Sequence, residues 1–73
     1  MSNTETTHSQ ITVNGEPHAA RGALVSELVA ELGLDPRQVA VEINRTIIPR
    51  SAYATTALNA GDAVEVVRFI GGG

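Results

Sequence analysis

Only one stretch of this chain carries the apolar spacing of a helix. Between Ala23 and Leu34 the apolar side chains recur every three or four residues and form one stripe, made of Leu24, Val25, Leu28, Val29 and Leu32. The other face of this stretch holds Ser26, Glu27, Ala30 and Glu31. A single amphipathic helix can cover one face of a sheet and no more, so any sheet built from the remaining segments keeps one face open.

The two ends of the expected helix differ in quality. Gly33 supplies a left-handed residue that ends the helix, and Leu34 is placed to fold back on the last turn. Asp35 and Pro36 then prevent continuation. At the start, Glu27 stands where the acidic half of a capping box belongs, but leucine at position 24 has no oxygen with which to cap. We therefore expect a frayed first turn.

A hairpin is predicted before the helix. Gln10 to Val13 alternates polar and apolar residues, and Asn14-Gly15 is a strong signal for a two-residue turn. The return strand, Glu16 to Ala20, contains Pro17, which cannot donate to a ladder and so places the strand at a sheet edge. His18 is interpreted as an ordinary residue of that edge strand.

Strands also follow the helix. Val39 to Ile43 alternates with its β-branched residues inward, Asn44-Arg45 is the next turn, and Thr46 to Ile48 is a short strand ended by Pro49. Arg50 to Ala54 has room for a single helical turn, and Gly61-Asp62 then leads into a strand from Ala63 to Ile70. The fold class is therefore α+β, with a mixed sheet of four to five strands and one main helix packed on one face.

Size and composition exclude several classes of function. Seventy-three residues make one domain that buries only about 60% of the surface its unfolded chain exposes, which argues against a deep catalytic cleft. There is no cysteine, and two isolated histidines do not make a metal site. A net charge of −3 and two aromatic residues disfavour nucleic acid and anionic membranes as partners. With no signal peptide or spanning segment in the sequence, we expect a cytoplasmic protein.

The last strand runs directly into Gly71, Gly72 and Gly73. Three residues without side chains add little to a core, so we divide the chain into a disordered leader (1–9), a folded domain (10–70) and a flexible tail (71–73). Extended, the tail reaches about 10 Å beyond Ile70 and delivers the carboxylate of Gly73.

We place the last strand centrally beside the first, because it is the richest in valine, with Val64 and Val66 toward the helix. Glu65, Val67 and Phe69 then lie on the open face and form a docking patch beside the tail. The plain alternative also stands at this point, because a few exposed apolar side chains are normal for any protein.

Several segments together resemble the sulfur carrier proteins of thiamin biosynthesis, which belong to the ubiquitin-like β-grasp group. They are VNGE (13–16), SELVAELG (26–33), VAVEINRTIIPRSAY (39–53) and NAGDAVEVVRFIGGG (59–73). The family usually carries Ser or Thr where Leu24 stands and begins at the first strand, so the leader is interpreted either as an extension or as residues foreign to the natural protein.

The resemblance implies a carrier and not an enzyme. A partner adenylating enzyme of the E1-like class would use MgATP to convert the carboxylate of Gly73 into an acyl adenylate, and sulfur from a cysteine desulfurase or another donor would then give a thiocarboxylate. Thiazole synthase would receive that sulfur. In this interpretation Gly71 and Gly72 give a slender reach, and the partner-binding residues are Glu65, Val67, Arg68 and Phe69. No cofactor would be bound by the chain itself. Arg50 is assigned to turn structure, through a salt bridge or carbonyl contacts.

Three alternatives remain open from the sequence. The small subunit of molybdopterin synthase shares the fold, the di-glycine end and the thiocarboxylate chemistry, although the run from Asn44 to Arg50 favours the thiamin branch. A ubiquitin-like protein modifier is a different class. All five basic residues are arginines, so lysine-linked chains of this protein with itself are excluded, but conjugation to other proteins is not. A purely non-covalent binding module leaves the glycine end unexplained and ranks last.

Overall fold

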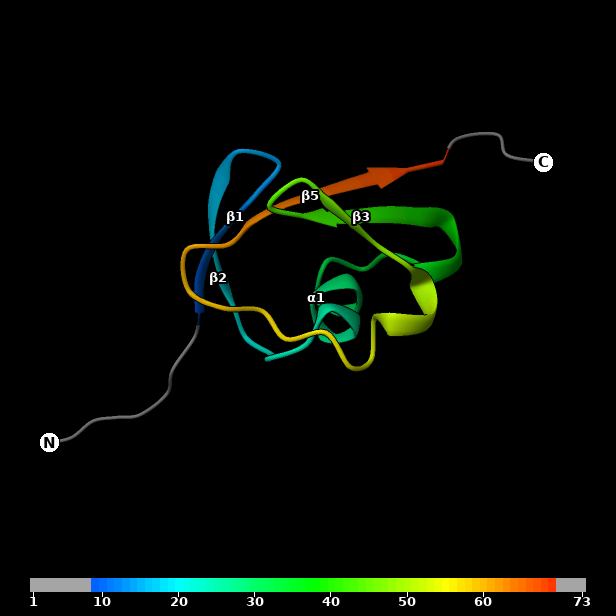
Figure 1. The fold of residues 1–73 in the computed structure, drawn as a ribbon, viewed down its shortest axis with the longest axis horizontal. Coiled ribbons are helices and arrows are strands. Elements are labelled where there is room, and N and C mark those ends of the chain that lie inside the picture. Colours follow the sequence, from blue (N-terminus) through cyan, green and yellow to red (C-terminus); the bar gives the residue numbers. More distant parts are fainter. Residues whose placement is uncertain (1–8, 70–73) are drawn as a thin grey trace, which may run out of the picture.

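Five strands form one mixed sheet in the order β2-β1-β5-β3-β4, and helix α1 lies against one of its faces (Figure 1). The computed structural model describes residues 9–69. The strands are β1 (Ser9–Val13), β2 (Glu16–Ala20), β3 (Val39–Ile43), β4 (Thr46–Ile48) and β5 (Ala63–Arg68); the helices are α1 (Val25–Glu31) and two 3-10 turns, η1 (Pro36–Gln38) and η2 (Arg50–Ala52). The α+β class, the five strands and the single main helix agree with the sequence expectation.

The first hairpin has the predicted turn. Asn14 and Gly15 take φ values of +52° and +85°, the left-handed pair that a tight two-residue hairpin needs. β1 and β2 are antiparallel, β1 begins at Ser9, one residue earlier than expected, and β2 is an edge strand as Pro17 predicted. Asn44 and Arg45 repeat this geometry in the β3–β4 hairpin, at +51° and +71°.

The expectation of a frayed first turn in α1 is wrong. The backbone N–H groups of Val25 and Ser26, which no side chain of Leu24 could satisfy, donate to the carbonyls of Thr56 (3.0 Å) and Tyr53 (2.9 Å). Glu27 also accepts from the N–H groups of Ala23 and Leu24, at 2.7 and 3.0 Å. The chain that follows η2 therefore caps the helix, and it runs along the helix side of the sheet in Figure 1.

The C-terminal end of α1 follows the sequence more closely, although the helix is shorter than the apolar stripe. Gly33 takes a φ of +75°. Its N–H donates to Ala30, and the N–H of Leu34 folds back to the carbonyl of Val29. The helix thus ends where the left-handed glycine was expected to end it.

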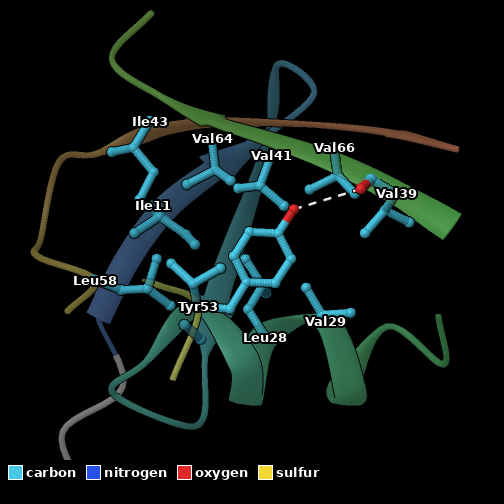
Figure 2. Close-up of a cluster of buried hydrophobic side chains, with 12 residues drawn as sticks. Ile11, Leu28, Val29, Val39, Val41, Ile43, Tyr53, Leu58, Val64 and Val66 are labelled. Atoms are coloured by element: carbon cyan, nitrogen blue, oxygen red, sulfur yellow. Dashed lines mark hydrogen bonds between the residues drawn. The ribbon is translucent and has the colours of Figure 1, made fainter. Parts of the chain in front are cut away.

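Strand β5 is central, between β1 and β3, as predicted from its valines. It runs parallel to β1 and antiparallel to β3. Val64 and Val66 point toward α1 and join a buried cluster with Leu28, Val29 and Val41 (Figure 2). Tyr53 enters this cluster from the segment after η2, and its hydroxyl donates to the carbonyl of Val39 at 3.4 Å. The core therefore fixes β5 from the helix side.

The described part of the chain contains neither a candidate membrane span nor a candidate metal cluster. Within residues 9–69, no helix has the length and apolar character needed to cross a membrane. Within the same residues, no three His, Cys, Asp or Glu side chains gather where a metal ion could be held.

Candidate functional site

The uncovered face of the sheet carries the predicted docking residues. Glu65, Val67 and Phe69 are all exposed, whereas Val64 and Val66, which alternate with them, are buried. Val67 is 56% exposed and Phe69 is 55% exposed, so more than half of each residue's surface is accessible to a partner. The face assignment made from the sequence is therefore correct.

Ile47 extends the apolar part of this face, and the sequence did not single it out. Its side chain is 69% exposed. In the register of β4 with β3, Ile47 stands opposite Glu42, and Glu42 in turn stands opposite Glu65 on β5. Ala40 stands opposite Val67 in the next row. We call the set Ala40, Glu42, Ile47, Glu65, Val67 and Phe69 the open-face patch.

Two glutamates stand opposite one another in the open-face patch. Glu42 and Glu65 are direct cross-strand partners on β3 and β5. Like charges that lie opposite one another in an antiparallel pair destabilise the sheet. Stability alone therefore does not explain this pair, which presents concentrated negative charge between exposed apolar side chains. A basic group on a partner surface would complement it.

The two arginines singled out from the sequence occupy different environments. Arg68 is exposed at the end of β5 and stands opposite Val39. Arg50, at the start of η2, directs its Nη1 to the carbonyl of Arg37 at 3.5 Å. That contact agrees with the carbonyl-binding role in turn structure predicted for Arg50.

The end of β5 is fastened on both sides. On the β3 side, the N–H of Phe69 donates to the carbonyl of Gln38 at 2.9 Å. On the β1 side, the side-chain amide of Asn14 accepts from the N–H of Val66 at 2.8 Å and donates to its carbonyl at 3.1 Å. These hydrogen bonds fix β5 and the residue after it, Phe69, which is the last described residue. Gly71, Gly72 and Gly73 lie outside the described residues.

The clearest electrostatic effect lies away from this face. Asp35 accepts from the Arg37 guanidinium at 3.2 Å (Nε) and 3.1 Å (Nη2), and from its backbone N–H at 2.9 Å. These bonds hold the pKa of Asp35 below its ordinary value, and the hydrogen bonding from the Arg37 side chain has the largest effect. The pair orders η1, which leads into β3, and belongs to the scaffold.

The chain resembles known proteins in both sequence and structure. A family model described as the ThiS family matches residues 9–73. The chain belongs to the ThiS family. The crystal structure of a thiamine biosynthesis protein (ThiS) from Geobacter metallireducens superposes with a TM-score of 0.72 at 40% identity, covering 88% of this chain and 99% of that one. The mixed five-stranded sheet with one helix is thus the ubiquitin-like β-grasp fold of ThiS.

Curated relatives of this ThiS chain include a sulfur carrier protein and two thiazole synthases. The sulfur carrier protein ThiS of Thermus thermophilus is 34% identical over 61 residues, which is 84% of this chain and 95% of the relative. A thiazole synthase of Paramagnetospirillum magneticum is 48% identical over 65 residues, and one of Magnetococcus marinus is 45% identical over the same length. Each of these two matches includes 88% of this chain but only 20% of the thiazole synthase. The chain therefore spans about a fifth of the length of these two relatives.

Besides the exposure of Ile47, the sequence did not reveal three side-chain contacts. It indicated Asn14 and Asn44 only as turn residues and His18 only as an edge-strand residue. Asn44 accepts from the N–H of Ala63 at 3.0 Å, and His18 Nε2 lies 3.1 Å from Glu31 Oε2. Both asparagine side chains bond to segments far away in the chain, so the turn signal at these positions did not reveal their partners.

Proposed function

We propose that this chain is a sulfur carrier whose Gly73 carboxylate is adenylated, converted to a thiocarboxylate and used as the sulfur donor to thiazole synthase. The observation that carries the proposal is the combination of a ThiS family match over residues 9–73 with an exposed Val67 and Phe69 at the end of the central strand. Membership of this family supports the thiamin branch over the small subunit of molybdopterin synthase.

The chemistry follows from the weak reactivity of a carboxylate. A carboxylate oxygen of Gly73 attacks the α-phosphorus of ATP on a partner enzyme, with Mg²⁺ on the phosphates, and pyrophosphate leaves. The acyl adenylate then has AMP as its leaving group. The terminal sulfur of a persulfide on a desulfurase displaces AMP and forms an acyl disulfide with Gly73. Thiols then cleave this disulfide in a two-electron reduction, which releases the thiocarboxylate and leaves the thiols oxidised to a disulfide. All of these catalytic groups belong to the partners, and the chain acts as a co-substrate.

The curated relatives support thiazole synthase as the acceptor. In two proteins named thiazole synthase, a segment covering a fifth of the protein is 48% and 45% identical to this chain. A carrier-like segment within the named acceptor fits a carrier that works beside that enzyme. The open-face patch is the surface that would meet the partners, because its exposed apolar side chains border the strand that leads to Gly73.

Intact mass spectrometry tests the proposal. The chain is incubated with the adenylating enzyme of its own organism, MgATP, a desulfurase, cysteine and a reductant. Exchange of one oxygen for sulfur at Gly73 adds about 16 Da. A variant with one alanine appended after Gly73 is the matched control, and it should keep the fold and gain no mass. An unchanged wild-type mass with an enzyme proven active on another carrier would overturn the proposal.

A further inference from the structure

The backbone N–H and C=O groups of successive β5 residues point alternately toward β3 and toward the β1 side, as the following hydrogen bonds show. Asn44 donates its N–H to Ala63 and Phe69 donates its N–H to Gln38, at 2.8 and 2.9 Å. In an antiparallel register these bonds direct the N–H and C=O groups of odd-numbered β5 residues toward β3. The groups of Val64, Val66 and Arg68 therefore point toward the β1 side.

The β1 side is occupied only as far as Val66. The carbonyl of Val64 accepts from the N–H of Asn14 at 2.8 Å, and the side chain of Asn14 takes both backbone groups of Val66. Gly15, with a φ of +85°, then turns the chain away into β2. Within residues 9–69, nothing pairs with the backbone N–H or C=O of Arg68.

We propose that an extended segment of the adenylating enzyme pairs with these two groups of Arg68, adding a strand to the β1 side of β5 just beyond the Asn14 amide. The inference deepens the proposed function and rests on it. The partner segment would continue the series of hydrogen bonds that β1 and the Asn14 side chain make with β5. Strand β5 would then lie between β3 and a strand of the enzyme. Binding by strand addition draws on main-chain hydrogen bonds rather than on the arginine side chain.

The adenylating enzyme is the expected partner at Arg68 because the reactive residue, Gly73, follows closely in the chain. Gly73 is five residues beyond Arg68, so their separation is at most about 18 Å even in a fully extended chain. An enzyme that grips the carboxylate of Gly73 therefore has protein surface close to Arg68. Val67 and Phe69 flank Arg68 with side chains that are 56% and 55% exposed on the open face. An enzyme that covers these side chains also reaches the open edge beside them.

The test compares two substitutions at one position. Arg68→Ala removes the side chain and keeps the N–H, whereas Arg68→Pro also removes the N–H and places a ring on the open side. Proline is tolerated at an unpaired edge position and favours an extended residue before it, which suits Val67 in β5. Val67→Pro is the contrasting control, because Val67 belongs to the set that bonds to β3, so this variant should lose stability.

Affinity for the adenylating enzyme is measured by calorimetry without ATP. Both variants lack the arginine side chain, so their ratio isolates the backbone N–H. We expect Arg68→Pro to bind at least about tenfold more weakly than Arg68→Ala, the effect of roughly one lost hydrogen bond. Equal affinities for the two variants would overturn the proposed strand addition.

Hydrogen exchange of the wild-type chain gives a second reading that does not depend on whether a variant folds. The Arg68 amide should exchange rapidly in the free chain and become protected in the complex. Exchange that stays rapid in a saturated complex would overturn the inference. Protection that appears without enzyme, and grows with the concentration of the chain, would assign the edge to a second copy and would also overturn it.

The two proposals fail in different ways. A wild-type chain that binds the enzyme but gains no adenylate with MgATP contradicts the proposed function, while the affinity and exchange measurements still decide the strand addition. A wild-type chain that does not bind the enzyme overturns both. Normal adenylation with an Arg68→Pro variant that binds as tightly as Arg68→Ala overturns the strand addition alone.

Discussion

The side-chain amide of Asn14 pairs with the backbone of Val66 as though it were another residue of strand β1. It accepts from the Val66 N–H at 2.8 Å and donates to the Val66 carbonyl at 3.1 Å. The two residues are 52 positions apart in the chain. The turn between β1 and β2 therefore secures the strand that leads to the glycine tail.

Replacing Asn14 by glycine should destabilise the domain by about 1–2 kcal/mol, because two hydrogen bonds are lost while the left-handed backbone is kept. Asn14→Ala should cost about 1 kcal/mol more, since alanine resists a φ of +52°. Urea unfolding measures both changes, and the Val66 amide should exchange faster in both variants. Asn44→Gly is the control: it should lose stability without altering exchange at Val66. An unchanged unfolding midpoint for Asn14→Gly would contradict this role.

Local signals were enough to place the strands and to choose their faces. The alternation of Val64, Glu65, Val66 and Val67 indicated which side of β5 meets the helix, and the presence of turns at Asn14-Gly15 and Asn44-Arg45 was readable from residue type. Pro17 indicated that β2 is an edge strand of the sheet. Each of these features depends on residues adjacent in the chain, so the sequence alone could reveal it.

The features that could not be predicted are contacts between distant segments. The first turn of α1 appeared unable to form a cap from its own residues, but carbonyls of Tyr53 and Thr56 satisfy it. The pairing of Asn14 with Val66 likewise depends on the final position of β5. A sequence without an alignment carries no local trace of such partners. The family resemblance indicated the fold but not these bonds.

The Asp35–Arg37 pair should be visible in an acid titration. Bonds from Arg37 lower the pKa of Asp35 below its ordinary value of 3.8, so the ionised carboxylate favours the folded state above that pH. This contribution is lost as the pH falls through the lowered pKa of the folded state. In Arg37→Gln the pKa of Asp35 should move upward toward 3.8, as carbon-13 NMR of the carboxyl group would measure.

A matched control for that titration is Arg21→Gln. It removes a positive charge but has no described contact with Asp35. If Asp35 titrates at the same pH in Arg37→Gln as in wild type, the guanidinium bonds seen in the structure do not set its pKa.

The exposed position of Phe69 predicts a separation between stability and binding. Phe69→Asp should change the free energy of unfolding by no more than about 0.5 kcal/mol, because the side chain is 55% exposed. Its affinity for the adenylating enzyme should fall by about tenfold or more, as expected for an aromatic anchor of an interface. Val66→Asp is the control, since it places an unpaired carboxylate in the core and should unfold the domain. Thermal unfolding and calorimetry measure the two effects, and loss of folding in Phe69→Asp would reverse the assignment of faces.

The paired carboxylates of Glu42 and Glu65 predict that one substitution should raise stability and lower function together. Glu65→Arg replaces a repulsive cross-strand pair by an attractive one and should stabilise the sheet by about 0.2–1 kcal/mol in urea unfolding at low salt. The gain should shrink at high salt, where exposed charges are screened. Binding to the adenylating enzyme should weaken, because the negative charge of the open-face patch is lost. Glu16→Arg is the control, because it makes the same change of net charge on β2, opposite Val13. It should neither stabilise the sheet nor weaken binding to the adenylating enzyme. A Glu65→Arg variant that is more stable and binds unchanged would show that the acidic pair has no part in partner recognition.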